Sequence, residues 1–135
     1  MLAARDTNAG VLKGKASFLS PEQLKGDQVD ARADLFATGV TLYALLGGGL
    51  PFTGNSDVEL LDAIVHNAPT PLSSLSSSST LPKALSSLVA SLLEKTPAQR
   101  PQTAREVREA LLPFAGGVDV VGCFVRGLGL PSLRS

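Results

Sequence analysis

The stretch from Asp30 to Leu46 constrains the fold more than any other part of this sequence. Its large apolar side chains cover nearly the whole circumference of a helix: Leu35, Phe36, Val40, Leu42, Tyr43, Leu45 and Leu46. A helix that is apolar on all sides is a buried one. Gly47-Gly48-Gly49 stops it, and Pro51 prevents it from resuming. We therefore expect a central helix that the rest of the chain surrounds.

Three capping boxes predict where further helices begin. In each, a Ser or Thr cap is followed three residues later by Gln or Glu: Ser20 with Gln23, Ser56 with Glu59, and Thr103 with Glu106. The first of these helices is short because Gly26-Asp27 follows it. Another helix begins after Pro82. With no convincing strand in the middle of the chain, the sequence predicts a mainly α fold.

Helical periodicity predicts which side chains of these helices point inward. After Pro82 they are Leu85, Leu88, Val89, Leu92 and Leu93. After Ser56 we expect Val58, Leu61, Ile64 and Val65, and after Thr103 we expect Ala104, Val107, Ala110 and Leu111, with an Arg105–Glu109 pair outward. The serine-rich segment from Pro71 to Thr80 is predicted to be an exposed loop.

Composition excludes several classes of function. Twelve basic residues balance twelve acidic ones, which leaves no electrostatic footprint for nucleic acid. Cys123 and His66, each the only one of its kind, cannot make a structural zinc site, and the single cysteine favours a reducing compartment. We expect His66 at the surface and Cys123 as an inert thiol. No segment is a convincing membrane span, so the expected location is cytoplasmic.

Four short motifs in order give the sequence its specificity. The segment from Gly14 to Gln23 holds Ser20-Pro21-Glu22; after it come Asp34 to Tyr43, then Leu50-Pro51-Phe52, then Glu94 to Pro101 with Arg100. This series, from about residue 10 to 112, resembles the C-terminal lobe of a bacterial-type Ser/Thr protein kinase. Ser20-Pro21-Glu22 resembles the family's Ala-Pro-Glu motif at the end of the activation segment. An unrelated small helical domain is the competing interpretation.

The resemblance implies structural roles for three residues. Glu22 and Arg100 are expected to form the family's buried ion pair, whereas on local sequence alone Glu22 is an exposed residue at a helix start. Asp34 is expected to hydrogen-bond the backbone of the catalytic loop. Because that loop does not occur in these residues, Asp34 faces water or finds another donor.

The resemblance also places a substrate loop and a modification site. The loop that receives the substrate residue after the phosphoacceptor corresponds to Lys15, Ala16, Ser17, Phe18 and Leu19. Many family members have Thr where Lys15 stands and Pro where Ala16 stands, so the substrate preference stays open. Thr7 lies in the region of the activation-loop phosphosite.

The resemblance divides the chain into three parts. Residues 1–22 correspond to a partial activation segment with the substrate loop, and residues 23–114 to the helical portion of the C-lobe. Residues 115–135 form a Gly-rich tail with no family match, which we expect to be poorly ordered.

The machinery of phosphoryl transfer is missing from the sequence. ATP and magnesium binding in the family needs a Gly-rich loop, a strand Lys, His-Arg-Asp and Asp-Phe-Gly, and none occurs here. We expect no catalytic, cofactor-binding or metal-binding residue and no activity from this chain. It is interpreted as an N-terminally truncated kinase fragment, with protein substrate or the missing kinase segments as partners. A non-catalytic helical protein-binding module is the alternative.

Overall fold

The computed structural model describes residues 16–75, 78 and 80–114, and the predictions for Thr7, Lys15, Cys123 and the tail lie outside them. Five α-helices make up the described part: α2 (Pro21–Lys25), α3 (Ala31–Gly47), α4 (Asp57–His66), α5 (Lys83–Leu92) and α6 (Ala104–Leu111). Short 3-10 turns are η3 (Leu72–Ser74), η5 (Pro97–Gln99) and η6 (Leu112–Phe114). No strand occurs among the described residues, which confirms the mainly α prediction.

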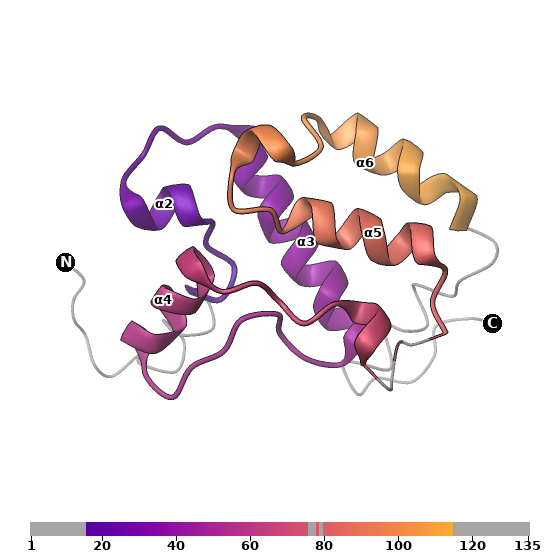
Figure 1. The fold of residues 1–135 in the computed structure, drawn as a ribbon. Helices are drawn as coiled ribbons and strands as arrows, with labels where there is room; N and C mark the ends of the chain where they lie inside the picture. Colours follow the sequence, from indigo (N-terminus) through magenta and orange to yellow (C-terminus); the bar gives the residue numbers. More distant parts are fainter. Residues whose placement is uncertain (1–15, 76–77, 79, 115–135) are drawn as a thin grey trace, which may run out of the picture.

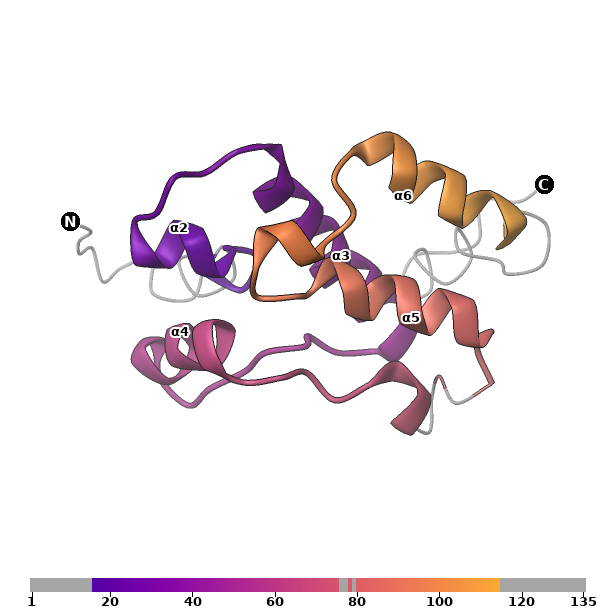
Figure 2. The ribbon, with the colours of Figure 1, turned by 45° about the horizontal axis from the view of Figure 1, so that its top comes forward.

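Helix α3 is the centre of the arrangement. It packs chiefly against α5, while α2 contacts α4 at one end and α6 contacts α5 at the other (Figure 1). Turning the molecule shows α4 below α2, with the extended segments before and after α4 running side by side toward α5 (Figure 2). Helices α3 and α5 approach each other closely at Gly39, where an added Cβ would lie 2.7 Å from Cβ of Leu92.

Helix α3 begins and ends as its sequence predicts. The Asp30 side chain accepts a hydrogen bond from the Arg32 amide, and Gly48 ends the helix in the left-handed conformation at φ 84°. The prediction that α3 is buried on all sides is wrong for one stripe along the helix. Asp34 and Thr41 are exposed and Leu45 is half-buried, while the opposite side of the helix is buried. The described residues cover only that opposite side.

The predicted N-caps are confirmed at α2, α4 and α6, with one difference in geometry. At α2, Ser20 and Gln23 form the reciprocal capping box. At α4 and α6, Ser56 and Thr103 cap the helix, but the returning Glu carboxylate accepts from the amide one residue before the cap. Both arrangements satisfy amide groups that the first helical turn leaves unpaired.

The buried faces of α4 and α6 differ from the predicted ones. Helix α4 buries Leu60, Ala63 and Ile64, whereas Val58 is 76% exposed. In α6, Val107 is buried and Leu111 half-buried, while Ala104 and Ala110 are exposed. The predicted inward residues of α5 are confirmed, with Leu88 half-buried, and the Arg105–Glu109 pair lies outward at 3.6 Å.

The serine-rich segment is not simply an exposed loop. Leu72 is buried in the core, and the buried Ser78 hydroxyl donates to the Leu72 carbonyl oxygen at 2.7 Å. This bond closes the turn that follows η3.

In the described part of the chain, no helix is long and apolar enough to cross a membrane. The cytoplasmic location stays a prediction.

Replacing Gly54 by Ala is expected to destabilise the fold by about 1–3 kcal/mol, as overpacking does. An added Cβ would lie 2.5 Å from the amide nitrogen of Leu60 and 2.8 Å from the carbonyl carbon of Glu59, so the backbone of α4 would have to move. Denaturant unfolding measures the change. The matched control is Gly49→Ala, because nothing lies within 4 Å of a Cβ there. Equal effects of the two substitutions would contradict this packing.

Candidate functional site

A buried ion pair joins the beginning of the described chain to its late segments. The guanidinium of Arg100 donates from Nη1 to Oε2 of Glu22 at 2.7 Å and from Nη2 to Oε1 at 2.7 Å. The Arg100 side chain is 0% exposed and that of Glu22 is 5% exposed. This two-bond geometry is the strong form of an Arg–carboxylate contact. The pair expected from the sequence is therefore present, and the exposed alternative for Glu22 is wrong.

Arg100 also organises the backbone around it. Its Nε donates to the Glu94 carbonyl oxygen at 2.8 Å, and its Nη1 donates to that of Arg32 at 2.9 Å. Its Nη2 donates to the Lys95 carbonyl oxygen at 3.3 Å. Together with Glu22, these acceptors use all five N–H groups of the guanidinium. One side chain thus fixes α2, the start of α3 and the loop after α5 to one another.

The hydrogen bonds of this pair shift the pKa of Glu22. Burial raises the pKa of the carboxyl group, but the hydrogen bonds and positive charge of Arg100 outweigh that effect. The pKa therefore lies below its usual value. Glu22 is ionised at neutral pH and holds its partner as a full ion pair.

Two stacked rings continue the ion pair into the core. The guanidinium of Arg100 lies 5.0 Å from the centre of the Phe36 ring, within the range of a cation–π contact. The Phe36 and Phe52 rings are stacked with their centres 6.0 Å apart. Lys95 Nζ lies 3.9 Å from the centre of the Phe52 ring. Each of the two rings in this column therefore has a cation beside it.

Lys95 connects this column to α4. Its Nζ donates to the carbonyl oxygen of Ile64 at 2.6 Å and to that of Ala63 at 3.5 Å, in the last turn of the helix. Cations are favourable at this end of a helix. Burial, helped by the charge of Arg100 and opposed by that of Glu94, lowers the pKa of Lys95 to about 8. Sequence reasoning missed Lys95 because nothing local marks it.

The free energy of unfolding is expected to rise with pH between 7.5 and 9.5. The pKa of Lys95 is lowered from 10.5 to about 8 in the folded chain. Above pH 8 the unfolded chain therefore keeps a proton that the folded chain has lost, which favours the folded state as pH rises. Unfolding at a series of pH values measures the slope, and Lys95→Met should flatten it. An unchanged slope in Lys95→Met would assign the titration to another group.

The predicted substrate loop lies next to the ion pair in the chain. Ala16 and Ser17 are buried, Leu19 is half-buried, and Phe18 is 38% exposed. Ser20, fully buried, caps α2 directly after the loop. The short helix with Glu22 thus anchors a loop that presents one aromatic side chain. Lys15 lies outside the described residues.

Two further residues singled out from the sequence, Asp34 and His66, lie at the surface. Asp34 is exposed on α3. His66 is exposed, as expected, with its Nδ1 3.0 Å from Asp62. Among the described residues no group of His, Cys, Asp and Glu side chains is placed to hold a metal ion.

The fold and the ion pair define a helical lobe that holds a loop against a central helix. The sequence profile described as protein kinase domain matches residues 2–111, and the chain belongs to this family. Its described part has the helical C-lobe fold of protein kinases. This agrees with the twitchin kinase region from C. elegans, which is 29% identical with a TM-score of 0.63. That match covers 74% of this chain and 17% of the twitchin chain.

Curated bacterial kinases are similar over most of this chain. Serine/threonine-protein kinase pkn2 of Myxococcus xanthus is 38% identical over 130 residues, or 96% of this chain. Serine/threonine-protein kinase PknB of Mycobacterium tuberculosis is 40% identical over 111 residues, or 82% of this chain. Tyrosine-protein kinase MasK of Myxococcus xanthus is 34% identical over 128 residues, or 90% of this chain. The chain spans 15%, 17% and 20% of the length of these relatives, respectively.

Proposed function

We propose that residues 16–114 form the protein-substrate side of a Ser/Thr protein kinase domain and that residues 1–135 alone do not transfer phosphate. The observation that carries the first half is the Glu22–Arg100 pair, which ties the loop from Ala16 to Leu19 to the helical frame. In this role the exposed Phe18 contacts the protein substrate. Catalysis then needs the nucleotide-binding groups of a kinase from outside these residues.

The second half rests on the chemistry of phosphoryl transfer. That reaction depends on metal ions and donors that neutralise charge on the transferred group. The ATP and magnesium ligands of the family belong to the Gly-rich loop, strand Lys, His-Arg-Asp and Asp-Phe-Gly, which do not occur in residues 1–135. Labelled ATP, magnesium and a peptide library containing Ser, Thr and Tyr test the purified chain. We expect no incorporation of phosphate, and turnover would contradict the proposal.

A chimaera tests the positive half. Residues 16–112 replace the corresponding stretch of Mycobacterium tuberculosis PknB, which the chain matches at 40% identity. We expect the chimaera to phosphorylate the peptide library and Phe18→Ala to change which peptides are preferred. A folded chimaera without activity, or one whose preference ignores Phe18, would contradict a substrate role.

Asp34 is proposed to bind the backbone of the catalytic loop in the complete kinase domain. Its side chain is exposed on the uncovered stripe of α3, where a further segment can reach it. In the chimaera, Asp34→Asn is expected to lower kcat at least tenfold, because the amide loses the charge-assisted acceptor. Residues 1–135 with the same substitution should keep their stability to within about 0.5 kcal/mol, as at surface sites. Asp27→Asn, in an exposed loop, is the matched control.

The second candidate is a non-catalytic protein-binding module. It is favoured by the continuous core of the described residues, which includes the fully buried Phe36, Val40, Ile64 and Leu85. Size-exclusion chromatography and thermal unfolding of residues 1–135 discriminate between the two candidates. A monodisperse chain with a cooperative transition supports the module, whereas aggregation with strong binding of an apolar dye supports a piece that needs the missing kinase segments.

A further inference from the structure

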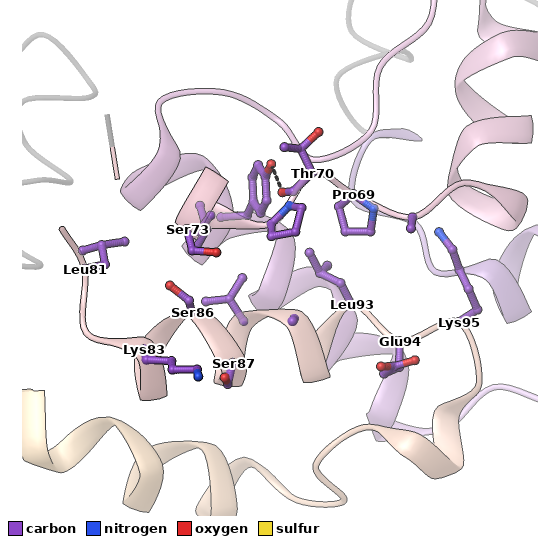
Figure 3. A pocket seen from close by; sticks show the side chains of 16 residues that line it. Pro69, Thr70, Ser73, Leu81, Lys83, Ser86, Ser87, Leu93, Glu94 and Lys95 are labelled. Atoms are coloured by element: carbon purple, nitrogen blue, oxygen red, sulfur yellow. Dashed lines mark hydrogen bonds between the residues drawn. The ribbon is translucent and has the colours of Figure 1, made fainter. Parts of the chain in front are cut away.

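A cavity of about 600 Å³ lies between α5 and the segment 68–73 that follows α4. The hydroxyl of Tyr43 on α3 donates to the Thr70 carbonyl oxygen at 2.5 Å and holds this segment in place (Figure 3). Pro69 and Pro71, which restrict the backbone, flank Thr70. The cavity therefore has walls fixed by a hydrogen bond and by stiff residues, and its volume is typical of small-molecule sites.

The lining is apolar in the middle and polar at one end. Leu72, Val89 and Leu93 contribute apolar side chains. Ser73 and Ser86 lie at the same end, and in Figure 3 their hydroxyl groups point toward the space between η3 and α5. Oγ of Ser86 is the only buried side-chain polar atom of the described residues that has no hydrogen-bond partner. A buried hydroxyl without a partner is unfavourable, so this atom would gain from a ligand.

At the other end of the cavity, the ammonium group of Lys95 already has partners. Lys95 lies there, and its ammonium group is engaged by the carbonyl oxygens of α4 and by the Phe52 ring. Glu94 lies beside it, so the two side-chain charges at this end are opposite in sign. This end therefore offers no uncompensated charge to a ligand. The unused hydrogen-bonding capacity lies at Ser86.

We propose that this cavity binds a small uncharged molecule with an apolar ring or chain and one hydroxyl group. The apolar body would replace water along Leu72, Val89 and Leu93. The ligand hydroxyl can both donate and accept, as the Ser86 hydroxyl can, so the two groups satisfy each other. Ser86 lines the cavity and is itself only partly buried.

The cavity is separate from the surface that the proposed function uses. Tyr43 and Asp34 are nine residues apart on α3, which places them on opposite sides of the helix at 3.6 residues per turn. A ligand beside Tyr43 therefore leaves the Asp34 stripe free. Ligand binding in this cavity does not depend on the proposed kinase role.

Titration of the full chain with 4-propylphenol and with propylbenzene tests the proposal, because the two probes differ only in the hydroxyl group. NMR of the backbone amides follows binding. We expect saturable shifts in α5 and in residues 68–73, and about fivefold tighter binding of 4-propylphenol, the effect of one hydrogen bond. Ser86→Ala should remove the difference between the probes. Ala90→Trp, at the cavity wall, should abolish binding of both.

Ala110→Trp on the exposed face of α6 is the control for the added indole, and it should bind like the unmodified chain. Circular dichroism checks that each variant keeps its helices. The proposal is overturned if neither probe saturates, if the two bind equally to the unmodified chain, or if Ser86→Ala keeps the difference. Shifts confined to residues that do not line the cavity would also overturn it, even if Ala90→Trp fails to fold.

Discussion

Glu22→Gln is expected to lower the free energy of unfolding by about 3–5 kcal/mol, the typical effect of breaking a buried ion pair from one side. The substitution keeps the size of the side chain but leaves the Arg100 guanidinium buried beside a neutral amide. Two hydrogen bonds of 2.7 Å lose their charged acceptor. Denaturant unfolding followed by circular dichroism measures the loss. The largest structural change should occur at α2 and the loop before it.

A matched control separates burial from charge. The Arg105–Glu109 pair is 83% and 61% exposed, so Glu109→Gln should change stability by less than about 0.5 kcal/mol. Arg100→Met should be more damaging than Glu22→Gln, because it also leaves three main-chain carbonyl oxygens without their donor. If Glu22→Gln behaves like Glu109→Gln, the pair does not anchor the loop.

Phe36→Ala is expected to cost about 3–5 kcal/mol, as truncation of a buried aromatic side chain usually does. Phe36 is 0% exposed and contacts both the Phe52 ring and the Arg100 guanidinium. Its removal leaves a cavity in the column and also takes away the cation–π contact. The same unfolding measurement applies, and binding of an apolar dye should increase as the core loosens.

Two comparisons make this expectation specific. Phe36→Leu should cost clearly less, because it refills much of the volume. Phe18→Ala should have a small effect, since that ring is 38% exposed and outside the column. If Phe36→Ala lowers the free energy of unfolding no more than Phe18→Ala does, the stacked rings do not support the core.

Local features of the fold were predictable from the sequence. Ser20, Ser56 and Thr103 cap helices as expected, because a cap is decided by neighbours within four residues. The limits of α3 follow from Asp30 and Gly48 in the same way. The Glu22–Arg100 pair could be predicted only through the family resemblance, because the two residues lie 78 positions apart.

Features that depend on tertiary contacts were not predictable. In α4 the apolar residues Val58, Leu60, Leu61, Ile64 and Val65 allow more than one inward face. The contact with α2 and the Lys95 bonds to the end of α4 orient the helix so that Leu60 is buried and Val58 is exposed. Lys95 itself is one of several similar lysines in the sequence. Only the meeting of Phe52, α4 and the loop after α5 makes it distinct.

The attachment of α4 has a consequence for how this surface can vary. Lys95 binds carbonyl oxygens of the helix, which every amino acid possesses, so the attachment does not depend on which side chains α4 carries. Outward positions such as Val58 and Asp62 can therefore be exchanged while Leu60, Ala63 and Ile64 stay in place. A library randomised at the outward positions should keep its helical placement, which makes α4 a natural place to engineer new recognition.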